Sequence, residues 1–130
     1  MKNRRWKNPI VWSSLFFIVQ LVLTFLYSNF YYSILIVLVT LFSIIYHLSH
    51  EKRYFLYDSL FALALIVKNL YSFSIRGFSS EYFKYTLIFV FIAFLFYYKS
   101  LRKNYSINHA MWHLTSSVIT IIAILSVNNS

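Results

Sequence analysis

Long apolar segments separated by short polar breaks run along the whole chain. A helix needs about 20 mostly apolar residues to cross the hydrocarbon layer of a bilayer, and five segments approach or reach that length. We expect these spans at about Pro9–Tyr27, Phe30–His50, Tyr54–Leu70, Tyr82–Tyr98 and Ile107–Val127. The longest polar break, residues 71–81, holds the only glycine, Gly77. With no repeat or linker, the sequence predicts one all-α integral membrane domain over residues 1–130, a multi-pass transmembrane helix bundle.

The composition agrees with a membrane protein. Of the 130 residues, 60% are hydrophobic and 22% aromatic, which is more apolar surface than a soluble domain of this size could bury. The net charge of +9 does not indicate a nucleic-acid partner, because the cations stand in short clusters between apolar segments, as topology signals and lipid-headgroup contacts do. The basic and then apolar N-terminus lacks a small-residue cleavage site, so we expect a retained first span.

The distribution of the cations predicts an orientation. With the N-terminus in the cytoplasm, nine lysines and arginines fall on the inner side, including Lys2, Arg4, Arg5 and Lys7. Three others, Lys68, Arg76 and Lys84, fall on or near the outer side. Cytoplasmic loops collect Lys and Arg, so we expect the N-terminus inside and the C-terminus outside.

Polar side chains inside the apolar segments follow helical spacing. One stripe on the second span consists of Thr40, Ser43, His47 and His50. A second stripe, on the fifth span, consists of His109, His113, Ser116 and Thr120. A weaker face of the third span carries Asp58, Ala62 and Asn69. Because polar groups in a bilayer avoid lipid, we expect these faces to meet.

Four of these polar residues should converge at one depth. At a rise of 1.5 Å per residue, His47, Asp58, His109 and His113 all fall within roughly 5–15 Å of the inner interface. The four-residue spacing of the histidine pair lets two imidazoles grip one metal, although the pair alone fits a polar helix interface equally well. Other polar or aromatic residues nearby have simpler readings. His50 could reach interfacial water, Ser43 could bond its own backbone, and Trp112 could belong to an aromatic belt.

The three histidines predict a zinc site. The chain has no cysteine, so a transition metal would need histidine and carboxylate ligands. Three imidazoles with an open fourth position form a catalytic zinc arrangement, in which a bound water has its pKa lowered to about 7. Asp58 could orient that water or take its proton, and Ser43 could donate to an oxyanion or to a substrate carbonyl.

The ordered set "SIIYH" (Ser43 to His47), Asp58 and "HAMWH" (His109 to His113) resembles the CREST superfamily of membrane hydrolases. That group includes the alkaline ceramidases, the progestin and adipoQ receptors with the hemolysin III proteins, and the post-GPI-attachment and myomaker-like proteins. The resemblance implies that the zinc ligands are His47, His109 and His113. It also implies that Asp58 lies near the zinc-bound water and that Ser43 is the family serine.

The chain also departs from the superfamily pattern. Family members typically have seven spans, and five are expected here. The aspartate stands in "LYDSL", whereas the receptor and hemolysin branch has "LDH", and the N-terminal acidic motif of eukaryotic ceramidases is absent. The resemblance therefore points to the superfamily and not to one of its branches.

Three functions are consistent with this pattern. The first is a zinc-dependent intramembrane hydrolase that acts on a lipid amide or ester, as a ceramidase does, with a membrane lipid as its substrate. The second is a non-enzymatic receptor-like, fusion-related or pore-forming membrane protein with a structural zinc site. The third is a small transporter or proton pathway built on Asp58 and the histidines.

Overall fold

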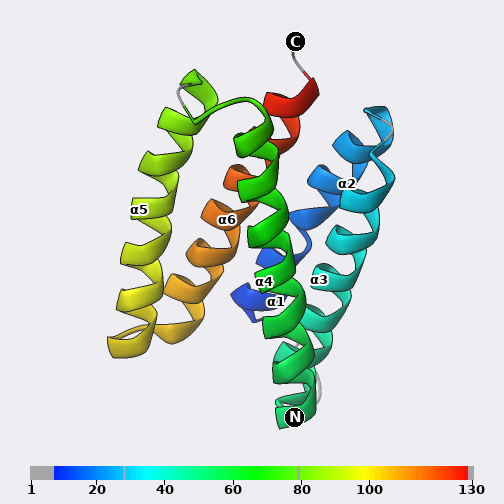
Figure 1. Cartoon of the computed structure of the whole chain (residues 1–130). Helices are drawn as coiled ribbons and strands as arrows, with labels where there is room; N and C mark the ends of the chain where they lie inside the picture. The colour runs from blue at the N-terminus through cyan, green and yellow to red at the C-terminus, as the bar shows by residue number, and fades with distance from the viewer. Residues whose placement is uncertain (1–7, 28, 79, 129–130) are drawn as a thin grey trace.

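The chain is an all-helical bundle, as the sequence predicts. The computed structural model describes residues 8–27, 29–78 and 80–128, and these contain helices and turns but no strand. The helices are α1 (Pro9–Ser14), α2 (Phe17–Leu26), α3 (Phe30–Ser49), α4 (Lys52–Ile75), α5 (Glu81–Arg102) and α6 (Tyr105–Asn128), shown in Figure 1. Within the described ranges, five helical segments are long and apolar enough to cross a membrane, with α1 and α2 together making the first.

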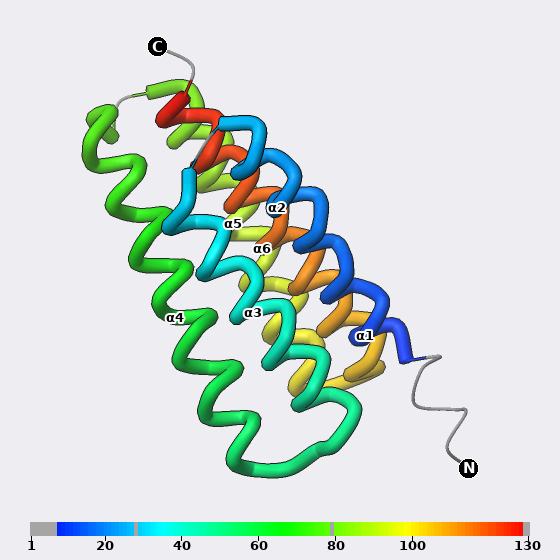
Figure 2. Tube along the Cα trace, turned by 90° about the vertical axis from the view of Figure 1, so that its right-hand side faces the viewer, coloured from blue at the N-terminus to red at the C-terminus, as the bar shows by residue number. Residues whose placement is uncertain are grey.

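The first span is divided near its start. Pro9 occupies the first helical turn, as expected, and the Asn8 side chain caps it by accepting from the Ile10 N–H at 3.0 Å. The N–H of Leu15 bonds the carbonyl of Trp12, and the N–H of Phe16 bonds that of Ser13, both at 3.1 Å. These hydrogen bonds from residue i to residue i−3 are of the 3₁₀ type, and they tighten the turn between α1 and α2. Figure 2 shows the two short helices following one another beside α6.

The third span is longer than predicted. The segment 71–75, expected in a polar loop, continues α4 to Ile75. The reason is tertiary: Phe73 is buried, and the buried Ser72 bonds both the Lys68 carbonyl and the Tyr32 hydroxyl. The helix ends at Ile75, and two residues later Gly77 has a φ of 72°, a left-handed value that glycine adopts without steric cost.

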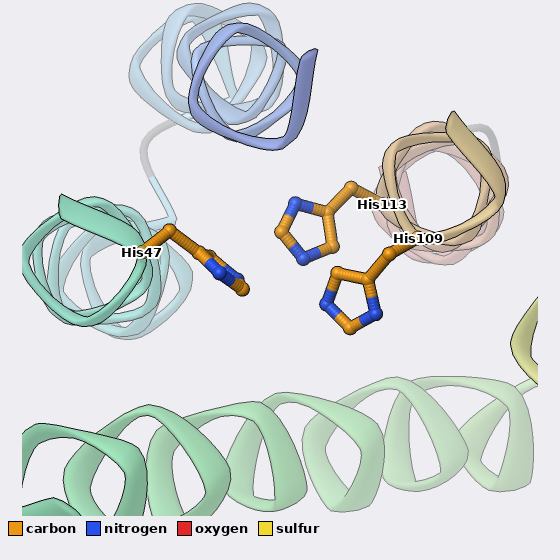
Figure 3. Close-up of side chains that lie close together, drawn as sticks. All are labelled: His47, His109 and His113. Atoms are coloured by element: carbon orange, nitrogen blue, oxygen red, sulfur yellow. The ribbon is translucent and has the colours of Figure 1, made fainter. Parts of the chain in front are cut away.

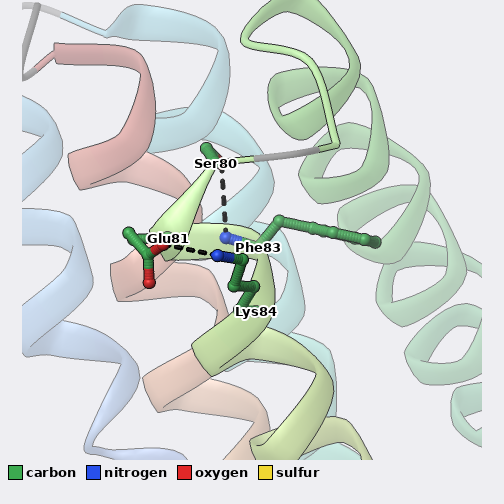
Figure 4. Close-up of polar contacts among 4 residues, drawn as sticks. All are labelled: Ser80, Glu81, Phe83 and Lys84. Carbon is green, nitrogen blue, oxygen red and sulfur yellow. Dashed lines mark hydrogen bonds and ion pairs between the residues drawn. The ribbon is translucent and has the colours of Figure 1, made fainter.

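The start of α5 is fixed by local contacts (Figure 4). The Ser80 side chain accepts a hydrogen bond from the Phe83 N–H at 3.3 Å, which satisfies one free donor of the first turn. Glu81 forms an ion pair with Lys84 at 2.5 Å, and the acid lies in the helix N-terminal turn, where negative charge is favoured.

Helix α6 lies at the centre of the bundle and packs against α1, α2, α4 and α5 (Figure 1). Helix α3 packs against α1, α2 and α4, whereas α5 packs mainly against α6. The core consists of Phe17, Tyr32, Ile36, Val39, Leu65 and Ile124. Large apolar side chains remain exposed on the outer faces, especially on α4 and α5, as expected for surfaces that face lipid.

Polar side chains join the helices inside the bundle. The Tyr32 hydroxyl donates to Asn69 Oδ1 at 3.0 Å, and Asn69 Nδ2 donates to Thr120 Oγ1 at 3.0 Å. The predicted polar faces of the third and fifth spans therefore meet. The stripe on α6 differs at one position: Ser117, not Ser116, is buried, and it accepts a hydrogen bond from Gln20 of α2. Ser117 lies four residues after His113, on the side of α6 against which α2 packs, and it is therefore the buried serine.

We name the end of the bundle that contains the α3–α4 and α5–α6 turns the histidine end. Lys52, Arg53, Lys99, Arg102 and Lys103 lie at or beside these turns. Lys2, Arg4, Arg5 and Lys7 of the predicted inner cluster lie outside the described residues. The predicted orientation, with the N-terminus inside, stays a prediction.

Candidate metal centre

Three histidines from two helices converge at the histidine end of the bundle (Figure 3). His47 comes from α3, and His109 and His113 come from successive turns of α6. One potential ligand atom from each lies within 4.8 Å of the other two. The ring centroids are 5.2 Å apart for His47 and His109, 5.5 Å for His47 and His113, and 4.8 Å for the α6 pair. This cluster could hold a metal ion.

The cluster is withdrawn from solvent and lipid. His47 is 2% exposed and His113 is 7% exposed, while His109 is half-buried. His50, the fourth histidine, is exposed and caps α3 in a left-handed conformation with φ 57°. It lies outside the cluster.

Two serines of α1 fix the far side of the His113 ring. Ser13 Oγ lies 3.2 Å, and Ser14 Oγ 3.1 Å, from Nδ1 of His113. Each hydroxyl has one proton and donates it to the Ile10 carbonyl, at 2.8 Å from Ser13 and 3.0 Å from Ser14. We therefore assign the ring proton of His113 to Nδ1, where the two serine oxygens share it as acceptors. A neutral imidazole in this tautomer has the lone pair of Nε2 free for a metal.

The other two histidines carry buried nitrogens without a hydrogen-bond partner among the described residues. These atoms are Nε2 of His47 and Nδ1 of His109. A buried polar atom without a partner is costly, and coordination to a metal is one way of satisfying a ring nitrogen. Ligand nitrogens around tetrahedral zinc lie about 3.3 Å apart, given bonds of about 2.0–2.1 Å. To hold zinc, the ligand atoms, which now lie within 4.8 Å of one another, would therefore close by up to about 1.5 Å. The residues fit a zinc ion.

Ser43 and Asp58 lie beside this cluster. Ser43 is 2% exposed and stands one turn before His47 on α3. Its Oγ lies 3.1 Å from Ser14 Oγ, and its side chain is close enough to act on the half-buried Asp58 carboxyl. Ser43 therefore connects α1 and α4 to α3 beside the histidines.

Aromatic side chains surround the histidines. Tyr105 stacks on His109 with ring centroids 4.9 Å apart, and the ring centroids of Tyr46 and His47 are also 4.9 Å apart. Phe17 approaches His113 edge-on at 6.3 Å. Trp112, which could have been an aromatic-belt residue, is half-buried and packs against Tyr97 and Phe94 of α5. These contacts fix the ring orientations and join α5 to α6 beside the site.

The sequence pattern did not identify the polar residues that the first span contributes to the interior of the bundle. Ser13, Ser14 and Gln20 are all buried, and they face α3 and α6. A signal was available in the sequence, because Ser13 and Gln20 are seven residues apart and therefore share one helix face. The division of this span into α1 and α2 keeps both residues directed inward, toward His113 and Ser117 respectively.

Comparison with known proteins does not extend this picture. No protein-family model, curated protein or solved structure matches the chain. The residues and their geometry present an all-helical membrane bundle with a cluster of three buried or half-buried histidines that could hold a metal ion.

Proposed function

We propose that the protein is a zinc-dependent intramembrane hydrolase of a lipid amide or ester, and a member of the CREST superfamily. One observation carries the proposal: three buried or half-buried histidines present ligand atoms within 4.8 Å of one another. The tautomer that Ser13 and Ser14 impose on His113 supports it, because it directs the free lone pair of Nε2 to a metal.

The donor set favours zinc among the transition metals. Neutral imidazoles without thiolates suit zinc, copper, iron and nickel, and three histidines with a vacant fourth position are typical of catalytic zinc. When bound, zinc supplies a Lewis acid and lowers the pKa of a coordinated water to about 7. In this proposal, His47, His109 and His113 hold the ion.

Asp58 and Ser43 complete the proposed machinery. Asp58 accepts a proton from the attacking water and returns it to the leaving group. Ser43 donates to the oxygen of the scissile carbonyl as negative charge develops there. Because its Oγ lies 3.1 Å from Ser14 Oγ, the Ser43 hydroxyl turns away from that contact and toward the substrate to do so.

The surroundings favour a lipid substrate. The site lies inside a bundle whose outer surface carries large exposed apolar side chains, a surface that a lipid approaches from within the membrane. The half-buried Asp58 and His109 are the members of the site that are most open to such a substrate. The carbonyl of an acyl chain near the interface is the chemical group that this site fits.

The test combines metal analysis with an activity assay. Purified protein in detergent should contain zinc and should hydrolyse at least one substrate among ceramides, acyl esters and phospholipids. A chelator should abolish turnover, and added zinc should restore it. Folded, zinc-loaded protein that hydrolyses no lipid on this panel would reject the hydrolase.

A structural zinc site in a non-enzymatic membrane protein is the second candidate. It is favoured because the cluster joins α3 to α6, and the serines on His113 add α1, so a metal here would tie three helices together. The two functions differ in their response to chelation. A hydrolase loses activity while its helices stay folded, whereas a structural site loses the fold with the metal.

A further inference from the structure

A pocket at the α5–α6 turn is lined by cations and polar side chains. Its volume is about 330 Å³, and its lining consists of Tyr98, Lys99, Arg102, Lys103, Asn104 and Asn108. The three cations are exposed and stand within five positions of one another in the chain. The pocket belongs to the histidine end, and Asn108 directly precedes His109.

Within the described part of the chain, no carboxylate faces the positive charge of this pocket. The sequence contains three acidic residues in all. Glu51 pairs with Arg53 at 2.7 Å, and Glu81 pairs with Lys84 at the opposite end of the bundle. Asp58 lies on α4, where its carboxyl acts with Ser43. Among the described residues, none of these carboxylates lines the pocket, so its three charges are left for an anion from outside.

The turn that carries the cations is held in place. Asn108 Nδ2 donates to the Lys103 carbonyl at 2.6 Å and to the Asn104 carbonyl at 3.3 Å. Asn104 itself adopts a left-handed conformation with φ 50°, which asparagine tolerates better than most residues. The Arg102 guanidinium lies 4.4 Å from the centroid of the Tyr98 ring. An anion would therefore meet a preformed arrangement of charges.

The flanking side chains identify the source of the anion. Leu101 is 67% exposed, and Ile107 and Tyr105 are also exposed beside the cations. Apolar and tyrosine side chains next to a cationic cluster at a helix end are suited to the boundary between acyl chains and headgroups. We propose that this pocket binds the phosphate headgroup of an anionic phospholipid, with the exposed apolar side chains against its acyl chains. This binding does not depend on the proposed zinc chemistry.

Lipid binding to full-length protein tests the proposal. Delipidated protein in neutral detergent would be titrated with short-chain phosphatidylglycerol, phosphatidylcholine or inorganic phosphate and followed by native mass spectrometry. Each lysine or arginine near an anionic lipid contributes about 1 kcal/mol, so R102Q/K103Q should weaken phosphatidylglycerol binding by about tenfold or more. The matched control is K52Q/R53Q, which removes two cations from the other turn at the same end and should change the affinity by less than about twofold.

Three results would overturn the assignment. Equal losses in the two double variants would show a general charge effect. Equal affinity for phosphatidylcholine would show that the headgroup charge is not recognised. Inorganic phosphate binding as tightly as the lipid would make this a site for a soluble anion. Circular dichroism should show unchanged helix content in both variants. A loss of lipid affinity then does not come from a folding defect.

Discussion

Ser14 Oγ lies 3.1 Å from Nδ1 of His113, although 99 positions separate the two residues in the chain. Ser13 makes the same contact at 3.2 Å, and both hydroxyls are oriented by the Ile10 carbonyl. In the proposed metal site, these contacts would set the tautomer and ring direction of His113 before a metal binds.

The first prediction concerns these serines. The double variant S13A/S14A should bind zinc about 10- to 100-fold more weakly, because loss of outer-shell partners typically costs that much affinity. The measurement is competition for zinc with a chelator of known affinity. Ser126→Ala is the matched control, since Ser126 is equally buried but bonds only the Ala123 carbonyl of its own helix. An unchanged zinc affinity in S13A/S14A would remove the serines from the site.

The second prediction assigns the ligands. Wild-type protein should carry about one zinc per chain, and His47→Ala should lower that content sharply. His50→Ala is the control, because His50 is exposed at the end of α3 and lies outside the cluster. The metal content of purified protein, measured by elemental analysis, checks both. Loss of zinc in His50→Ala with retention in His47→Ala would move the assignment by one turn.

The third prediction separates chemistry from metal binding. Asp58→Asn should reduce turnover by about 10²- to 10⁴-fold while zinc stays bound, because the amide cannot accept the proton of the attacking water. Turnover and zinc content would be measured on the same preparation. Full activity of this variant would retain the enzyme but discard Asp58 as its base.

The fourth prediction concerns Ser43. Ser43→Ala should cost less than Asp58→Asn where water activation limits the rate, since one lost oxyanion donor typically costs about 3 kcal/mol. The loss should appear in kcat more than in KM, because the donated hydrogen bond strengthens as charge develops. A variant that raises KM alone would place Ser43 in substrate binding.

The fifth prediction concerns orientation. The chain has no cysteine, so single reporters can be introduced without a background. Asn128→Cys should react with an impermeant thiol reagent on intact cells, whereas Asn3→Cys should react only after permeabilisation. The opposite pattern would reverse the topology and place the histidine end on the outer side.

Most of the fold could be predicted because hydrophobic runs and helical periodicity are local signals. The five spans, the helical turn at Pro9 and the shared level of His47, His109 and His113 all follow from spacing along single helices. The spacing of residues along one helix does not show which neighbouring helix each of its faces contacts. The extension of α4 to Ile75 depends on Ser72 bonding Tyr32 of another helix. The choice of Ser117 over Ser116 depends on Gln20.

The candidate site also has residues that local spacing predicts and residues that it does not. Its histidines were predictable, because their residue type and four-residue spacing are rare in an apolar helix. The serines on His113 were not identified, because a serine in a membrane span most often bonds its own helix. Ser13 and Ser14 do bond their own helix, through Ile10, and that bond makes them acceptors for His113.

The division of the first span gives its two helices separate partners on α6. Helix α1 has six residues, and a tightened turn separates it from α2. Ser13 and Ser14 of α1 contact His113, whereas Gln20 of α2 contacts Ser117, so the first span is joined to α6 at two levels, one at the candidate metal centre and one beyond it.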